Sequence, residues 1–517
     1  MKNLSYEVYK SLRKKSSKNC VTDYSLNKPI KISNKLLLVL AITLSKEIKQ
    51  QSKNSDRVGI VIPNSGLGII ANLAVIFAGK VPVNLNFAST DDVARHCIAK
   101  SGLRLILTAS AVREKFRDFP FPGNNTIDCD VLLKKYKKTK ITLIKNYVLN
   151  SLPTFISCRI FNIPKKAIRD EFAVLFTSGS SGAPKGVALS HKNILENINA
   201  ICKVQNFPKK SKLLANLPLF HSFGFTVTMW LPLLKGIKLV TVPSPLEINK
   251  NIKAIETERV TILLGTPTFL RGYLRKGSSN KFKSVQYVVA GAEKSETEFI
   301  KQWENMANCK YLEGYGLTET SPVISLNSEG NGIQHGSVGR ILPNIMVKTI
   351  HPDTNESLGR LDTGLLCFRG DTIFMEYIMD ADKTKSAFKD GWFVTGDIGR
   401  IDENGFLHIE GRLARFSKIG GEMIPHEKIE SAIRKMLDLN EEDENNIAIV
   451  GKPHETKGEE LYLLSTRPIN FKELREKLAK ELGNLFVPKK HKKVDEIPVL
   501  PTGKLDIQKL KTLVNEK

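Results

Sequence analysis

The stretch that most constrains this chain runs from Leu175 to Val187 and reads LFTSGSSGAPKGV. It begins on an apolar run typical of a strand, continues through hydroxyl side chains and glycines, and then delivers one lysine after Pro184. Glycine lets the backbone turn so that several N–H groups point into one concavity, and hydroxyl groups add short donors. With one positive charge at its rim, such a loop is suited to binding a polyphosphate. The residues predicted to bind it are Thr177, Ser178, Gly179, Ser180, Ser181, Gly182 and Lys185.

Two other interpretations of this loop fit less well. A flexible Gly/Ser linker has a similar composition, but linkers are rarely bounded by strand-like runs on both sides. A Walker loop requires glycine directly before the lysine, and Pro184 stands there instead.

The net charge narrows the class of partner. The chain has 517 residues, enough for two or three domains, and carries a net charge of +25 from 78 Lys and Arg against 53 Asp and Glu. Such a field attracts nucleic acid, an anionic membrane or an acidic protein, although a lysine-rich proteome would give the same composition. Nucleic-acid-binding motifs are lacking in the sequence, so we expect no nucleic-acid partner.

The cysteine pattern and the hydropathy both indicate the cytoplasm. The seven cysteines are scattered and form no CxxC pair, which disfavours a disulfide framework or a zinc site. Residues 1–7 lack the apolar core of a signal peptide, and the uncharged run from Val58 to Gly79 is interrupted by proline and glycine. We therefore expect a cytoplasmic protein without a transmembrane span. Its basic surface would also suit peripheral contact with the inner face of the cytoplasmic membrane.

Short apolar runs alternate with helical patterns through much of the chain, which predicts an α/β fold. Strands are expected at 57–62, 80–86, 103–107, 172–176, 237–242 and 260–264, and helices at 35–50, 70–78, 91–100 and 190–197. Residues 111–170 are rich in lysine and show no clear pattern. Beyond about residue 413 the chain reads as a separate unit, with helices at 425–436 and 470–482 and strands at 447–450 and 461–465.

Several strand-like runs end in glycine turns, where open α/β sheets place ligands. The first such turn is Gly291, Ala292 and Glu293, and the second is the run from Gly314 to Glu319. Further on, Asp397 follows Gly396, and Arg412 closes an apolar run.

Taken in order, these motifs resemble the adenylate-forming superfamily of acyl-CoA synthetases, luciferases and peptide-synthetase adenylation domains. The resemblance covers roughly residues 30–510. Within the superfamily the chain is most similar to acyl-acyl-carrier-protein synthetases, on the stretches 81–87, 415–423 and 503–506. The resemblance implies a large N-terminal adenylate-forming domain with mainly parallel sheets (1–412) and a small mobile α+β C-terminal domain (413–517).

The family's reaction joins a carboxylate to ATP, releases pyrophosphate, and passes the acyl group from AMP to a thiol. By resemblance, the loop from Thr177 to Lys185 binds the β- and γ-phosphates, Thr318 donates to the α-phosphate, and Glu319 helps to hold Mg²⁺. Lys504 would bridge the incoming carboxylate and the α-phosphate. A solvated glutamate at a helix start is the alternative for Glu319, and a plain tail lysine is the alternative for Lys504.

The resemblance also assigns residues to the nucleoside and the acyl group. Gly291, Ala292 and Glu293 would form one wall of the adenine slot, and Gly314, Tyr315 and Gly316 the other. Asp397 would accept from the ribose hydroxyls and Arg412 would reach ribose or phosphate, whereas a simple turn aspartate is the alternative for Asp397. His221 would border the acyl pocket, although a lone histidine among aromatics is more often packed in a core.

The family rotates its C-terminal domain between the two half-reactions. Ala414 stands at the pivot, where the family usually has Asp or Lys, so side-chain contacts that hold each conformer are in doubt. Lys418, Gly420 and Gly421 would line the approach of the thiol.

Three functions remain for the sequence. The preferred one is transfer of a fatty acyl group to the phosphopantetheine of an acidic acyl carrier protein, toward which a basic surface would steer it. The second is fatty acyl-CoA ligation. The third is a non-catalytic AMP- or acyl-binding protein, which is disfavoured because the phosphate loop, Glu319 and Lys504 are all present.

Overall fold

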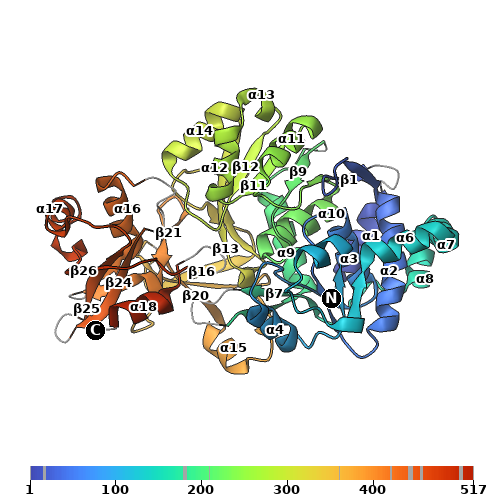
Figure 1. The fold of residues 1–517 in the computed structure, drawn as a ribbon, viewed down its shortest axis with the longest axis horizontal. Helices are drawn as coiled ribbons and strands as arrows, with labels where there is room; N and C mark the ends of the chain where they lie inside the picture. The colour runs from blue at the N-terminus through green and yellow to red at the C-terminus, as the bar shows by residue number, and fades with distance from the viewer. Residues whose placement is uncertain are drawn as a thin grey trace.

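The fold was analysed in a computed structural model, which describes residues 2–14, 19–177, 183–208, 210–359, 361–419, 422–439, 446–454, 458–499 and 505–515. The N-terminal part holds two large sheets and a smaller third one. The C-terminal residues gather at one end of the molecule, shown in orange and red in Figure 1. The amino-terminal helices lie toward the opposite end.

A seven-stranded sheet contains the two strands that flank the predicted phosphate loop. Its order is β18-β8-β7-β4-β3-β5-β6, with the strands from β7 to β6 parallel and β8 and β18 antiparallel. The strands are β3 (Arg57–Ile60), β4 (Val81–Asn84), β5 (Ile106–Thr108), β6 (Thr126–Asp128), β7 (Glu171–Thr177), β8 (Lys185–Ser190) and β18 (Glu376–Tyr377). Because β7 and β8 are antiparallel neighbours, Thr177 and Lys185, which flank the predicted phosphate loop, lie opposite each other.

A nine-stranded sheet presents the predicted nucleoside site. Its order is β15-β14-β13-β12-β11-β9-β10-β1-β2, parallel from β13 to β1 and antiparallel at both edges. The strands are β1 (Asn19–Asp23), β2 (Ile30–Ser33), β9 (Lys212–Ala215), β10 (Lys238–Thr241), β11 (Ile262–Gly265), β12 (Tyr287–Ala290), β13 (Lys310–Gly316), β14 (Val323–Leu326) and β15 (Arg340–Ile341). The carboxyl ends of β12 and β13 therefore meet at one edge of this sheet.

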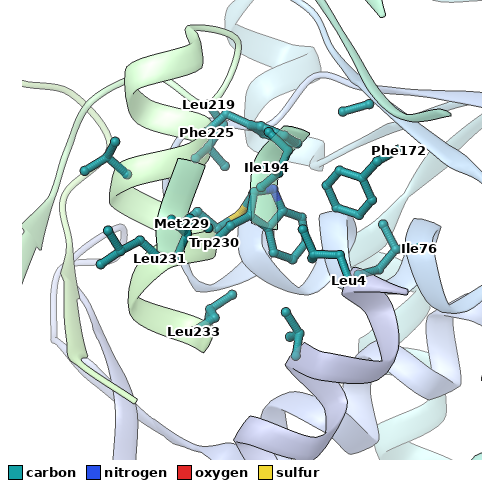
Figure 2. Close-up of a cluster of buried hydrophobic side chains, with 14 of the residues drawn as sticks. Leu4, Ile76, Phe172, Ile194, Leu219, Phe225, Met229, Trp230, Leu231 and Leu233 are labelled. Atoms are coloured by element: carbon teal, nitrogen blue, oxygen red, sulfur yellow. The ribbon is translucent and has the colours of Figure 1, made fainter. Parts of the chain in front are cut away.

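Helices cover these sheets and bury the main core. They are α1 (Leu4–Lys14), α2 (Asn34–Gln51), α3 (Gly66–Phe77), α4 (Asp91–Lys100), α9 (His191–Val204), α10 (Leu231–Lys235), α11 (Ile248–Glu258), α12 (Pro267–Lys276), α13 (Ser279–Phe282) and α14 (Thr297–Ala307). Ser190 caps α9, as predicted, by accepting from the Asn193 N–H. In Figure 2, Trp230 lies among Phe172, Phe225 and aliphatic side chains from several elements, and its ring centroid is 5.2 Å from that of Phe172. Phe225 and Trp230 belong to a π-helical segment, Phe223–Trp230, which this packing anchors directly after His221.

Residues 111–170, which showed no clear pattern, are largely helical. They contain most of α5 (Ser110–Lys115), then α6 (Cys129–Thr139), α7 (Ile141–Leu149) and α8 (Thr154–Phe161). Figure 1 shows α6, α7 and α8 at the end of the molecule farthest from the C-terminal residues.

A third sheet leads into the C-terminal domain. It contains β16 (Ile345–Ile350), β17 (Gly364–Gly370), β19 (Phe388–Lys389), β20 (Trp392–Ile401) and β21 (Leu407–Arg412), all antiparallel, with α15 (Ala381–Ala387) beside it. The C-terminal sheet contains β22 (Phe416–Ile419), β23 (Glu422–Pro425), β24 (Ile447–His454), β25 (Gly458–Ser465) and β26 (Lys490–Lys493). Three helices pack with it: α16 (His426–Met436), α17 (Phe471–Leu482) and α18 (Ile507–Asn515).

The predicted fold class is confirmed. The central strands of both large sheets are parallel and alternate with helices, and a smaller mixed unit with its own buried clusters follows. The α4 helix has the predicted bounds, and most other predicted elements lie within a few residues of their positions.

Candidate functional site

The hairpin of β7 and β8 positions the two ends of the phosphate loop. Thr177 and Lys185 are register partners across the hairpin. The inner residues of β7 from Phe172 to Leu175 are almost fully buried, which fixes the strand that ends at Thr177. The predicted loop residues Ser178, Gly179, Ser180, Ser181 and Gly182 lie outside the described part of the chain.

Lys185 and Glu319, which are distant in sequence, both contact Tyr377. The short strand β18 pairs with β8 and places the Tyr377 ring 4.9 Å from Lys185 Nζ. The Tyr377 hydroxyl donates to Glu319 Oε1 at 2.8 Å. Burial and the adjacent Glu319 carboxylate raise the pKa of Tyr377 far above its usual range, so this hydroxyl stays a donor. The structure thus joins a cation, a ring and a carboxylate in one chain of contacts.

Sequence reasoning missed Tyr377. Its contacts depend on the pairing of β18 with β8, which lies about 190 residues earlier in the chain, and a two-residue strand gives no periodic signal. The backbone reinforces the same junction, because Phe374 N–H donates to the Glu319 carbonyl at 2.8 Å.

The donor set around Glu319 fits Mg²⁺ shared with phosphates better than a metal site built wholly of protein ligands. Among the described residues, no group of three or more His, Cys, Asp or Glu side chains is arranged to hold a metal ion. Mg²⁺ usually keeps several waters and takes one or two carboxylates together with substrate phosphates. One carboxylate beside the phosphate hairpin is compatible with that mode of binding.

The two predicted walls of the adenine slot lie side by side. Ala290, at the end of β12, pairs with Glu313 of β13, so the glycines that follow these residues are adjacent. A Cβ on Gly291 would lie 3.2 Å from the Gly314 carbonyl oxygen, and one on Gly316 would lie 1.9 Å from the Pro322 carbonyl oxygen. Glycine at these two positions therefore keeps the backbones close.

Within the first predicted wall, Ala292 has an unusual backbone conformation and Glu293 makes side-chain hydrogen bonds. Ala292 is exposed and adopts φ +70°, in the left-handed region that alanine rarely occupies. The Glu293 carboxylate accepts from both the Thr268 N–H, at 3.1 Å, and the Thr268 hydroxyl, at 2.7 Å. The Glu293 side chain is thus engaged at the first turn of α12.

Asp397, Tyr315 and Arg412 form one cluster. The β20–β21 register pairs Asp397 with Arg412, and Arg412 Nε lies 3.1 Å from Asp397 Oδ1. The Tyr315 hydroxyl donates to the other carboxylate oxygen. Burial, reinforced by Asp397, raises the pKa of Tyr315 well above its usual range. Asp397 is only 3% exposed, and a charge so buried needs partners. Two side chains from separate strands supply them.

The structure corrects the core interpretation of His221. The histidine is exposed, its ring centroid lies 4.6 Å from that of Phe220, and Phe220 in turn contacts Phe87 edge to face. Next to it, the Thr318 hydroxyl donates to Ser222 Oγ at 3.2 Å. The Pro218–Ser222 turn therefore brings His221 near the predicted α-phosphate residue while Phe225 packs inward.

The predicted pivot, Ala414, is followed directly by a residue that is anchored to the C-terminal domain. Ala414 is exposed in a 3₁₀ turn, Leu413–Arg415, whereas Arg415 is buried and forms a 2.6 Å ion pair with Glu430 of α16. Lys418 pairs with Asp353, in the turn between β16 and β17, and this contact lowers the pKa of Asp353. Gly420, Gly421 and Lys504 lie outside the described residues.

Comparison with protein families gives two matches. Residues 40–378 match the model of the AMP-binding enzyme, and residues 428–504 match that of the AMP-binding enzyme C-terminal domain. This chain belongs to the AMP-binding enzyme family.

Relatives of this AMP-binding enzyme include curated proteins named long-chain-fatty-acid–CoA ligase. The one from Bacillus subtilis is 27% identical over 489 residues, covering 88% of this chain and 84% of the relative. The one from Haemophilus influenzae is 28% identical over 499 residues, covering 90% and 86%. These names do not support the sequence-based preference for a carrier protein over CoA.

Solved structures share the fold over nearly the whole chain. ATP-bound MatB from Rhodopseudomonas palustris superposes with a TM-score of 0.77 at 24% identity, covering 100% of this chain and 99% of that one. The fatty acyl CoA synthetase of Mycobacterium tuberculosis gives 0.70 at 21% identity and 99% coverage of both chains. At this identity the likeness concerns the fold.

Proposed function

We propose that this AMP-binding enzyme is an ATP-dependent ligase that activates a long-chain fatty acid as acyl-AMP and transfers the acyl group to the thiol of CoA. The observation that carries the proposal is the contact chain from Lys185 through Tyr377 to Glu319. It gathers a cation and a carboxylate at the base of a hydroxyl- and glycine-rich hairpin, as binding of a metal-neutralised polyphosphate requires. The names of the relatives support the fatty acid and CoA.

The first half-reaction crowds negative charge around one phosphorus atom. A carboxylate oxygen attacks the α-phosphorus of ATP, the bond from that phosphorus to the bridging oxygen breaks, and pyrophosphate leaves with the electron pair. Cations and N–H donors lower this barrier by neutralising both anions. Lys185 and the loop would hold the departing end, and Thr318 the α-phosphate. Glu319 would hold Mg²⁺, which supplies further positive charge there.

The remaining residues would orient the nucleotide and the acid. Asp397 accepts hydrogen bonds from ribose, Arg412 reaches ribose or phosphate, and the two glycine turns flank adenine. Lys504 contacts both the carboxylate and the α-phosphate. His221 borders the acyl chain beside Phe220. A Cβ at Gly291 would also approach Phe223, at 3.8 Å, so the adenine wall adjoins the aromatic segment that would border the acyl group.

The second half-reaction forms the thioester. The thiol loses its proton to solvent, its sulfur attacks the acyl carbonyl carbon, the bond to the phosphate oxygen breaks, and AMP leaves with the electron pair. We place the domain boundary between residues 412 and 413, so that rotation about Ala414 carries Lys418 and the glycines at 420–421 toward the thiol channel. Arg415 is suited to transmit this rotation, because its ion pair with Glu430 and its bond to the Ile449 carbonyl attach it to the moving domain.

The charge of the chain favours a second acceptor, acyl carrier protein. A net charge of +25 would attract an acidic carrier, whereas CoA needs only a local binding site for its phosphates.

An assay with each acceptor tests this choice. Purified protein is incubated with ATP, Mg²⁺ and palmitate, with either CoA or holo-carrier protein as the acceptor. Thioester on CoA is expected. Thioester on the carrier alone overturns the choice of CoA, and absence of pyrophosphate release with either acceptor overturns the ligase.

The role of Lys504 is tested in the same assay. Lys504→Ala is expected to lower acyl-AMP formation by about a thousandfold, a loss typical of one key electrostatic group. Lys509→Ala, which removes an exposed lysine of α18, serves as the matched control. Equal rates for Lys504→Ala and the parent protein contradict the assigned role.

A further inference from the structure

The segment 131–169 is exceptionally basic. It contains ten lysines and arginines and not one aspartate or glutamate, within a chain that has 53 acidic residues in all. The basic residues are Lys134, Lys135, Lys137, Lys138, Lys140, Lys145, Arg159, Lys165, Lys166 and Arg169. A segment that combines this charge with packed helices presents a concentrated positive field.

The same segment exposes large apolar side chains to solvent. On α7, Ile141, Ile144 and Val148 are spaced i, i+3 and i+7, so they form one stripe, and they are 76%, 60% and 57% exposed. Phe155 on α8 is 75% exposed. Such a set is costly in water and usually marks a contact surface.

The side of α7 that faces α2 carries a buried polar residue. The inward side chain of α7 is Asn146, which is fully buried. Its amide donates to Thr43 Oγ1 at 2.9 Å and accepts from Lys46 Nζ at 3.0 Å, both on α2. The helix therefore satisfies a buried polar group on its inner side and keeps its isoleucines outside, the reverse of an ordinary surface helix.

Basic groups border the apolar stripe. Lys35 Nζ of α2 lies 3.3 Å from the centroid of the half-exposed Tyr147 ring, and Lys145 is exposed on α7 itself. Lys135, Lys137 and Lys138 are exposed on the adjoining helix α6. Apolar side chains ringed by lysines match the two layers of an anionic bilayer surface, acyl chains below and phosphates above. An acidic protein partner would match the charge but would leave the exposed apolar stripe without a matching apolar layer.

We propose that α6, α7 and α8 form a membrane-docking surface, which places Ile141, Ile144 and Phe155 at the acyl boundary of an anionic bilayer and the lysines among its headgroups. Among the described residues no helix is both long and apolar enough to cross a membrane. The surface lies at the end of the molecule away from the C-terminal domain (Figure 1), so docking leaves that domain clear of the bilayer. The choice of a lipid surface rests in part on the proposed function, since a long-chain fatty acid partitions into bilayers.

Vesicle binding tests this surface directly. The full chain is sedimented with vesicles of phosphatidylcholine alone, or of phosphatidylcholine with phosphatidylglycerol at roughly two to one. Binding to the anionic vesicles is expected, weakening as salt is raised. The combined variant Ile141→Ser, Ile144→Ser, Phe155→Ser is expected to lose at least about tenfold in affinity. Leu246→Ser, which removes a side chain that is 73% exposed elsewhere, is the control and should bind like the parent.

Two triple variants with the same change in net charge distinguish binding by a local surface from attraction by the total charge of the chain. Lys135→Glu, Lys137→Glu and Lys138→Glu together are expected to weaken binding about a hundredfold, at roughly fivefold or more per lysine. Lys253→Glu, Lys276→Glu and Lys283→Glu change the net charge equally, on exposed positions near the nine-stranded sheet, and should have a small effect. Equal losses for the two triple variants overturn the proposal, as does the absence of binding to anionic vesicles.

Two further measurements distinguish membrane docking from the ligase activity and from dimerisation. Acyl-AMP formation from dissolved octanoate, with no vesicles present, should be unchanged in the serine variant, so loss of vesicle binding with normal chemistry supports a docking role. Light scattering of the parent and of Ile144→Ser tests the other occupant of the stripe. A dimer that the substitution dissociates would show that a second copy of the chain covers it and would overturn the membrane assignment.

Discussion

The candidate site and the α6–α8 surface depart from ordinary protein architecture in opposite ways. At the site, a buried carboxylate and a half-buried one each have partners: Asp397 has Tyr315 and Arg412, and Glu319 has Tyr377. On the surface, large apolar groups such as Ile141 and Phe155 lie in water. A folded chain maintains either arrangement only at a cost in stability, which indicates that both are kept for binding.

The two regions differ in what their unusual groups do for folding. A buried charge that loses its partner is expensive, because the remaining charge stays out of water. An exposed isoleucine that is replaced by serine removes nothing from the core. Substitutions at the site should therefore disturb both stability and activity, whereas those on the surface should disturb neither.

Asp397→Ala should have the largest effect. It removes the predicted ribose acceptor and leaves the Tyr315 hydroxyl and the Arg412 guanidinium without their shared carboxylate. We expect kcat/KM for ATP to fall by at least about a hundredfold, equivalent to about 3 kcal/mol. Pyrophosphate release at varied ATP measures this, with the exposed Asp382→Asn as the control. A change below about threefold would show that Asp397 is only a turn aspartate.

Glu313, directly before Gly314, tests what burial of a carboxyl group costs in stability. The effect of burial on its pKa exceeds that of its hydrogen bonds. Burial raises the pKa of Glu313 from 4.5 to about 7, although the Gly336 and Ser295 N–H groups oppose the rise. A carboxyl with a raised pKa stabilises the fold below its unfolded pKa and loses that contribution as pH rises through its folded pKa. The contribution should therefore disappear between about pH 4.5 and 7.

Urea unfolding at roughly pH 5 and pH 8 measures this loss, which should be about 2 to 3 kcal/mol for the parent protein. Glu313→Gln keeps an acceptor for the Gly336 N–H but cannot ionise, so its stability should vary with pH by that much less. The same pH dependence in both proteins would assign it to other groups.

Tyr377→Phe should have a smaller effect. It keeps the ring beside Lys185 but removes the hydroxyl that holds Glu319. One hydrogen bond to a charged group contributes about 1.5 kcal/mol, so pyrophosphate release should slow roughly tenfold. Tyr287→Phe is a matched control, since that hydroxyl also donates to a glutamate, Glu329, at 2.7 Å, outside the predicted nucleotide and acyl contacts. Equal activity in the two variants would remove Tyr377 from the site.

The same contrast explains what could be predicted from the sequence. Roles for Asp397, Thr318 and the glycine turns could be predicted through the family resemblance, because it rests on local patterns: a glycine or hydroxyl beside such a residue leaves a signature of a few positions. Helix α4 was predictable to the residue because its pattern and its acidic first turn agree. Tyr377 was not, because its role arises from a strand pairing between distant segments.

Helix α7, within residues 111–170, escaped prediction because its exposed apolar stripe does not face the core. Helix prediction by periodicity assumes that apolar side chains face the core. In α7 the buried position is Asn146 and the apolar stripe faces out, so the pattern indicates no packed face. The inversion that hid α7 is also an observation on which the docking surface rests.

Ile144→Ser should have the smallest effect on folding and therefore gives the sharpest contrast between the regions. Ile144 is 60% exposed, so its replacement should change the free energy of unfolding by less than about 0.5 kcal/mol. The comparison is Ile42→Ser on the neighbouring helix α2, where the side chain is 1% exposed and the same substitution should cost about 3 kcal/mol or more. Urea unfolding of both variants, beside their vesicle binding, separates folding from docking. If Ile144→Ser destabilised the protein as strongly as Ile42→Ser, the stripe would belong to the core of the fold, and its exposure could no longer be attributed to a membrane.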